Sequence, residues 1–179
     1  MTPSATERDA HTLRRQLATL DQQRITAATQ NGVYTGGLHL AVMTGPFLDL
    51  ICAGAKTVES RFHRQRRSPL FVARSEDVVV FRQSGKSATL AAVLSDALYL
   101  DLEEHPLAAV RRTWASRIGC DDDDFWQARA DARWVSLLTL DTVLPIPPTV
   151  LHKRDRQGWV TYPTVADGYA RQDRVDAPL

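Results

Sequence analysis

Alternating and continuous hydrophobic runs along the chain predict several β-strands. Leu38–Met43 alternates weakly between apolar and polar residues, whereas Asp77–Arg82 holds the run Val-Val-Val-Phe that is typical of a buried strand. Arg133–Leu144 also alternates, with Ser136 on the same side as large apolar residues, and predicts a closing strand. We expect the prolines at positions 145, 147 and 148 to end that strand, because proline cannot donate an amide hydrogen bond.

Apolar residues at helical spacing predict three helices. The first is one amphipathic helix over Thr6–Gln30, ended by Asn31-Gly32. Its apolar stripe is thin, which leaves a role in a dimer contact open. The second helix starts at Thr44 as N-cap and ends at Gly54, and the third covers Glu103–Ile118.

Ser87–Leu100 is ambiguous between a helix and a strand. Its leucines and alanines recur at helical intervals and favour a helix. The preceding turn around Gly85 fits a hairpin. Taken alone, the pattern predicts a helix.

Charged residues interrupt the apolar pattern between Gly54 and Arg61. If Val58–Phe62 is extended, Glu59 and Arg61 lie on the same face, about 7 Å apart. The two side chains can pair with each other or with a ligand. Lys56 can reach the same region, or it can act as a cation at the end of the preceding helix.

The pattern Gly-x-Lys-x-x-Glu-x-Arg, at Gly54, Lys56, Glu59 and Arg61, resembles the signature of the ASCH domain, a member of the PUA-like superfamily. The flanking blocks are similar too, namely Leu38-His39-Leu40, Asp77–Arg82 with Ser84-Gly85, and Lys153–Trp159. The resemblance implies an α+β fold, a PUA-like (ASCH) mixed β-barrel flanked by helices. It also implies that Ser87–Leu100 is a strand.

The resemblance covers residues 36–160, which we assign to the ASCH/PUA-like domain. Residues 1–35 are then an N-terminal helical extension, and residues 161–179 a polar C-terminal tail. At 179 residues, the chain fits one domain with extensions.

Composition and cysteine spacing exclude several classes of protein. The net charge of +1 gives no overall basic character, and no apolar run is long enough to span a bilayer. The segment Met1–Asp9 lacks the regions of a signal peptide, so we expect a cytoplasmic protein without membrane partners. Cys52 and Cys120 have no metal-ligand spacing. Asp121–Asp124 fits the N-cap and acidic first turn of a short helix better than a metal site, and we expect neither metal nor cofactor.

Basic residues gather in two places. Four arginines and a histidine lie in the seven residues from Arg61 to Arg67, either as a solvated loop or as an arm that contacts phosphate. Lys153–Trp159 combines cations with an aromatic residue, so Trp159 either stacks a base or plugs the barrel. Gly85-Lys86-Ser87 is not a phosphate-binding P-loop, because the first glycine of that motif would fall at Val80.

The resemblance implies an RNA- or nucleotide-binding protein with a basic cleft around the signature. In this hypothesis cations neutralise phosphate and Glu59 orients Arg61 or accepts from a base edge. The predicted binding residues are Lys56, Glu59, Arg61, Arg64, Lys86, Lys153 and Arg154. The expected partner is RNA or a nucleotide-like ligand, and a dimer through the N-terminal helix stays open.

The resemblance leaves hydrolysis as the alternative. A ribonuclease would use Glu59 as general base, with Lys56 and Arg61 stabilising the phosphate transition state. ASCH-like amidohydrolases that act on acetylated cytidine carry a threonine at the position of Glu59. Thr57 is nearby but has the opposite strand parity.

Overall fold

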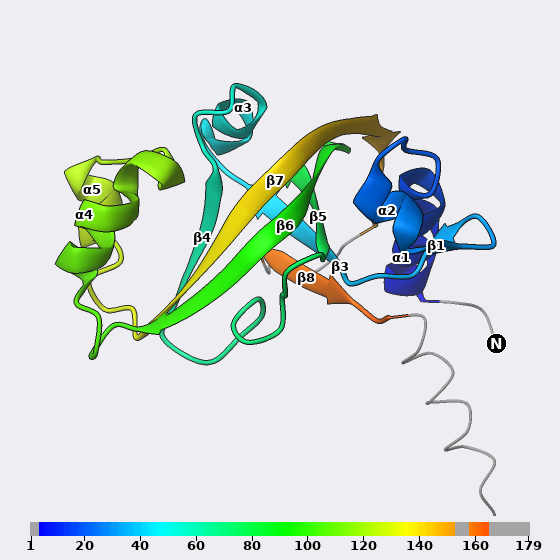
Figure 1. Cartoon of the computed structure of the whole chain (residues 1–179). Coiled ribbons are helices and arrows are strands. Elements are labelled where there is room, and N and C mark those ends of the chain that lie inside the picture. Colours follow the sequence, from blue (N-terminus) through cyan, green and yellow to red (C-terminus); the bar gives the residue numbers. More distant parts are fainter. Residues whose placement is uncertain (1–3, 153–157, 165–179) are drawn as a thin grey trace, which may run out of the picture.

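The computed structural model describes residues 4–152 and 158–164, and within them six strands form one curled sheet in the order β4-β7-β6-β5-β3-β8 (Figure 1). These strands are β3 (Leu38–Met43), β4 (Val58–His63), β5 (Val78–Gln83), β6 (Ala88–Asp101), β7 (Trp134–Thr149) and β8 (Trp159–Tyr162). The hairpin of β1 (Thr29–Gln30) and β2 (Val33–Tyr34) forms a separate small sheet. The helices in the same residues are α1 (Ala5–Leu17), α2 (Gln23–Ala27), α3 (Phe47–Cys52), α4 (Leu107–Ile118) and α5 (Asp123–Gln127).

The long β6–β7 pair bends the main sheet. Its register shifts between Ala92 and Val93 and again between Leu94 and Asp96, and such bulges increase bend and twist. Beyond the bend, β7 pairs with β4 over Trp134–Thr139. The sheet therefore curls into a half-barrel, and its edge strands β4 and β8 do not pair with each other in the described residues. Parallel pairing of β3 with β5 makes the sheet mixed, and the predicted α+β class with a mixed sheet flanked by helices is confirmed.

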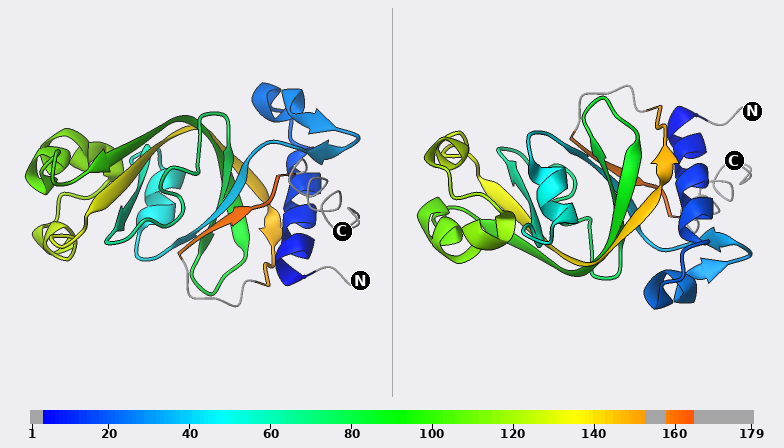
Figure 2. Two further views of the ribbon diagram at one scale, coloured as in Figure 1. Left: turned by 90° about the horizontal axis from the view of Figure 1, so that it is seen from below. Right: turned by 90° about the horizontal axis from the view of Figure 1, so that it is seen from above.

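Both faces of the curled sheet are buried. In β3, Leu38 and Leu40 pack in one apolar cluster with α1, while Ala41 and Met43 belong to another inside the curl. A further cluster packs α4 and α5 against β4 and β7. α3 lies over the opening of the curl, between α1 on one side and α4 and α5 on the other (Figure 2). Double burial explains the unbroken apolar run of β5, and β6 is a strand, as the resemblance implied.

The prediction of a single helix over Thr6–Gln30 is wrong. α1 ends at Leu17, and α2 starts anew after Gln22, whose side chain accepts a hydrogen bond from Ile25 N at 2.9 Å. Asn31 and Gly32 form the turn of the β1–β2 hairpin, with φ of 50° and 70°. Asn-Gly favours such left-handed turns, so the dipeptide signals a hairpin here and not only the end of a helix.

The prolines do not end β7. The strand continues through them to Thr149, which pairs with Ala88 of β6. Because β4 pairs with β7 only as far as Thr139, the later part of β7 has a free edge, where a missing N–H is tolerated.

Some element boundaries also differ from the predictions. Pro46 and not Thr44 precedes α3, without a side-chain cap, and α4 starts at Leu107. β8 continues past residue 160 to Tyr162. The short acidic helix is confirmed, because the Asp122 side chain caps α5. Across the described ranges, every helix is too short or too polar to cross a membrane.

Candidate functional site

The three charged signature residues form one ion-pair network inside the curled sheet. Glu59 and Arg61 are two residues apart and therefore both lie on the inner face of β4, as strand parity predicted. Glu59 Oε1 lies 2.6 Å from Arg61 Nε, and Glu59 Oε2 lies 3.2 Å from Lys56 Nζ. One carboxylate therefore serves two cations.

Lys56 is buried and its ammonium group is fully used. Only 3% of the residue is exposed, and Nζ also donates to the carbonyl oxygens of Val58 at 2.7 Å and Ile118 at 3.1 Å. With Glu59, these acceptors account for all three ammonium protons. Ile118 is the last residue of α4, so Lys56 is the cation at the end of α4 and not of α3. Burial lowers the pKa of Lys56, and the charge of Glu59 opposes that shift.

Glu59 is held as a carboxylate. Burial raises its pKa, but the charges of Arg61 and Lys56 outweigh burial, and the net pKa is below the ordinary value. Both oxygens already face cations, and a low pKa makes a weak proton acceptor. Glu59 is therefore better suited to hold Arg61 in position than to accept a proton.

Arg61 reaches from β4 across the open side of the half-barrel. Its Nη2 donates to Val42 O of β3 at 3.2 Å, and its guanidinium lies 5.6 Å from the ring centroid of Trp159 in β8. Nη1 has no acceptor within residues 4–152 and 158–164, and a Cβ at Gly158 would lie 2.8 Å from it. We call the contacts of the Arg61 guanidinium with Val42 and Trp159 the Arg61 seam, because they join β4 to β3 and β8 through one side chain.

Two residues that sequence reasoning did not propose lie beside the Arg61 seam. Ser136 of β7 is the register partner of Arg61, and its Oγ lies 3.5 Å from His63 Nε2. Burial, with the charges of Arg61 and Arg67, lowers the pKa of His63 to about 4. His63 is therefore neutral at pH 7, and a pKa of about 4 makes its ring a weaker proton acceptor than an ordinary imidazole. The weak signal for Ser136 was a hydroxyl on the otherwise apolar side of an alternating strand.

Solved structures of an ASCH protein resemble this one. The crystal structure of ASCH from Zymomonas mobilis matches with a TM-score of 0.56 and 16% identity, covering 76% of this chain and 94% of that chain. The chain has an ASCH-like fold. Two single-residue variants of the Z. mobilis protein match at TM-scores of 0.55 and 0.51, with 16% and 18% identity, 76% of this chain and 95% and 96% of theirs.

No protein-family model matches the sequence, and no curated protein matches it. The likeness to the Z. mobilis structures lies in the fold, and it confirms the predicted resemblance to the ASCH domain at that level. The chemistry of the site has to be argued from the residues of this chain.

Trp159 is buried in the interior of the ASCH-like sheet. It is 4% exposed and its ring lies 5.3 Å from that of His39. The sequence left two roles open for Trp159, stacking a base or plugging the barrel, and its burial confirms the plug. Lys153 and Arg154, which precede Trp159 in the chain, lie outside the described residues.

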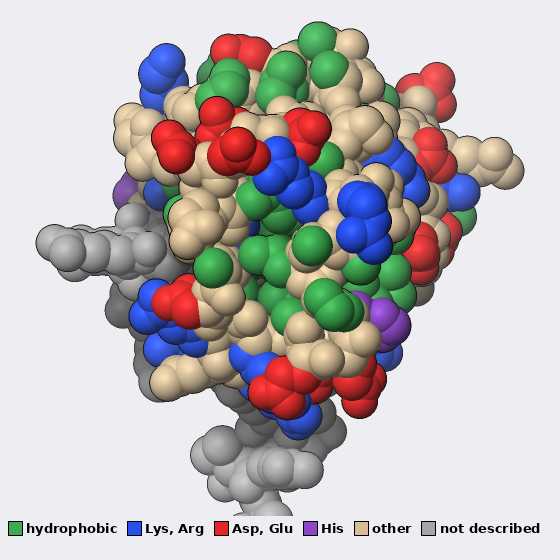
Figure 3. Space-filling model, turned by 90° about the vertical axis from the view of Figure 1, so that its left-hand side faces the viewer, with side chains coloured by type: hydrophobic (Ala, Val, Ile, Leu, Met, Phe, Trp, Pro, Cys, Tyr) green, Lys and Arg blue, Asp and Glu red, His purple; other side chains and the backbone are tan. Residues whose placement is uncertain are grey.

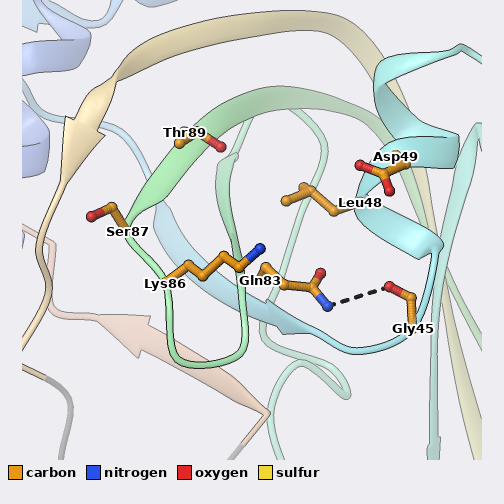
Figure 4. Close-up of a pocket in the computed structure, with 7 residues that line it drawn as sticks. All are labelled: Gly45, Leu48, Asp49, Gln83, Lys86, Ser87 and Thr89. Atoms are coloured by element: carbon orange, nitrogen blue, oxygen red, sulfur yellow. Dashed lines mark hydrogen bonds between the residues drawn. The ribbon is translucent and has the colours of Figure 1, made fainter.

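Arg64 and Lys86 are not members of the ion-pair network. Arg64 is exposed in the loop after β4 and pairs with Asp131. Lys86 lines a groove of about 340 Å³ between α3 and the β5–β6 turn, together with Asp49 and Gln83 (Figure 4). Gln83 Nε2 donates to Gly45 O at 3.3 Å on the floor of this groove.

The face over α4 and α5 is mixed in charge. Apolar side chains gather in its middle, with acidic and basic side chains around them (Figure 3). Arg111 of α4 pairs there with Asp121 and Asp123. Nowhere in the described ranges do three His, Cys, Asp or Glu side chains come close enough to hold a metal ion.

Proposed function

We propose that this protein binds RNA or a nucleotide-like ligand beside Arg61. The observation that carries the proposal is the partial exposure of Arg61, at 19% of its side chain, on an otherwise buried ion-pair network. Its Nη1 has no acceptor in residues 4–152 and 158–164 and lies beside Gly158. A guanidinium fixed on one side and unpaired on the other is suited to a phosphate oxygen.

The other predicted residues take distinct roles in this proposal. Lys56 and Glu59 are positioning residues, because their polar groups are used within the protein. Arg64 and Lys86 are exposed cations that contact phosphates farther along the ligand. Lys153 and Arg154 remain proposed phosphate contacts.

The test is the affinity for a pool of short RNAs, measured by fluorescence anisotropy at several salt concentrations. We expect Arg61→Lys to bind about 10-fold more weakly, because lysine keeps the charge but loses the planar fork. Arg15→Lys is the matched control, since Arg15 is exposed on α1. Unchanged affinity of Arg61→Lys, with an unchanged melting temperature, would reject the proposed contact.

Hydrolysis is a second candidate, favoured by the pair of Ser136 and His63. A hydroxyl 3.5 Å from a neutral imidazole is close enough for proton transfer after a small movement. Arg61 on the same face would stabilise negative charge in the transition state. In this candidate mechanism the general base is His63 and not Glu59, because both carboxylate oxygens of Glu59 form ion pairs.

Mass spectrometry after incubation with RNA and with acetylated cytidine tests this candidate. If the protein is a hydrolase, Ser136→Ala and His63→Gln each abolish turnover, and the rate rises with pH through the His63 pKa of about 4. If the unaltered protein binds RNA without turnover, the binding function is supported and the hydrolase candidate is rejected.

A further inference from the structure

Phe71 is an exposed aromatic residue in the loop between β4 and β5. It is 52% exposed and has φ of 59°, a conformation that a bulky side chain adopts only at an energetic cost. A large apolar side chain does not gain stability from water contact. Its outward position therefore needs a reason.

The ring of Phe71 is held in place by other aromatic residues. It lies 5.2 Å from the ring of Tyr99 and 5.8 Å from that of Trp134. The Tyr99 hydroxyl donates to Ala73 O in the same loop. The Arg66 guanidinium lies 5.6 Å from the Phe71 centroid and 4.9 Å from the Trp134 centroid. The ring is thus supported from behind while just over half of the residue faces solvent.

The charge around Phe71 is positive. Arg66, Arg67 and Arg74 have no acidic partner in the part of the chain that the structure describes. The acidic groups of this region are engaged elsewhere, since Asp77 accepts from Arg74 N and pairs with His39, while Asp101 and Glu103 pair with Arg133. An aromatic ring among unpaired arginines is the combination that binds single-stranded nucleic acid, because bases stack while phosphates are neutralised.

We infer that Phe71 stacks an unpaired base of single-stranded RNA, with Arg66 and Arg67 on the flanking phosphates. This inference rests on the proposed function and extends its site beyond Arg61. The two regions are neighbours, because the Phe71 ring lies 5.8 Å from that of Trp134, and Trp134 is the register partner of His63, two residues after Arg61 on β4. A paired duplex does not present a base face, so the ligand is single-stranded.

The experiment compares a single-stranded RNA octamer with an abasic octamer of the same length and charge. We expect Phe71→Ala to weaken binding of the RNA by about 10-fold and to leave binding of the abasic strand unchanged. Phe71→Trp should keep the affinity for RNA, since indole also stacks. Val150→Ala is the matched control, because Val150 is 70% exposed beyond the far end of β7.

Each outcome decides the inference. If Phe71→Ala binds RNA as well as the unaltered protein does, the stacking role is wrong and the exposed ring serves another partner, such as a protein. Equal losses for RNA and the abasic strand also overturn it, since they indicate a disturbed loop. If the unaltered protein binds neither strand, the proposed function itself fails.

Discussion

At the scale of single residues, Glu59 sets the charge balance inside the curled sheet. Glu59→Gln would leave Lys56 and Arg61 without a counter-charge in a buried setting. We expect this variant to lose about 3–5 kcal/mol of unfolding free energy, measured by urea denaturation at pH 7.

Lys56→Met is the matched variant for that measurement. It leaves the neutral pair of Glu59 and Arg61 in place, so we expect a smaller loss of stability than in Glu59→Gln. Equal losses in the two variants would contradict the shared-carboxylate arrangement.

His63 makes stability depend on pH. Its pKa is about 4 in the folded protein and 6.5 without the fold, so between these values the unfolded chain binds more protons. The free energy of unfolding therefore falls as pH is lowered from 6.5 towards 4. We expect urea midpoints of His63→Gln to fall less over this range than those of the unaltered protein. If the urea midpoints of the two proteins fall in parallel as the pH is lowered, His63 has the same pKa in the folded and the unfolded chain.

Strand parity alone predicts that Glu59 and Arg61 share a face, because parity depends only on neighbouring residues. The other half of the site depends on long-range register. Ile118 reaches Lys56 from the end of α4, and Ser136 reaches His63 through the β4–β7 pairing. Nothing local in the sequence specifies either contact.

At the scale of elements, α1 is tied to the sheet by a buried arginine. Arg14 donates to the carbonyl oxygens of Tyr34 at 2.9 Å, Gly36 at 2.7 Å and Pro163 at 2.9 Å. It links the helix near the N-terminus to the segment after β8. Arg14 is 4% exposed, and this burial lowers its pKa.

Arg14→Leu would leave three carbonyl groups without their donor. We expect a loss of about 2–5 kcal/mol in unfolding free energy, because each unsatisfied buried acceptor is costly. Arg15→Leu is the control, since Arg15 is exposed in the same helix turn. A similar effect of the two substitutions would mean that helix propensity, and not these bonds, sets the outcome.

Elements with one clear pattern were predictable, and elements defined by their neighbours were not. β3, β4 and β5 follow from their apolar runs and the signature. β6 has apolar residues on both faces, so its alternation is lost and it resembles a helix until β5 and β7 are placed beside it. β7 runs through its prolines because its outer edge is free there, and that freedom is a property of the assembled sheet.

At the scale of the whole molecule, side chains and not backbone pairing close the ASCH-like sheet within the residues that the structure describes. β4 and β8 are the two edges, and the Arg61 seam spans the interval between β4 and the β3–β8 pair. The same side chain is the proposed phosphate contact. If Arg61 binds phosphate as proposed, ligand binding and closure of the half-barrel are coupled at one residue.

The open edges also bear on aggregation. An unpaired strand edge is a template for another chain, and proteins protect such edges with short strands and inward-pointing charges. β8 has four residues, and β4 carries Glu59 and Arg61 on its inner face. We expect Arg61→Val to associate as its concentration rises, seen by light scattering, while Arg61→Lys stays dispersed. The charges of the signature would then keep β4 from recruiting a strand of a second molecule.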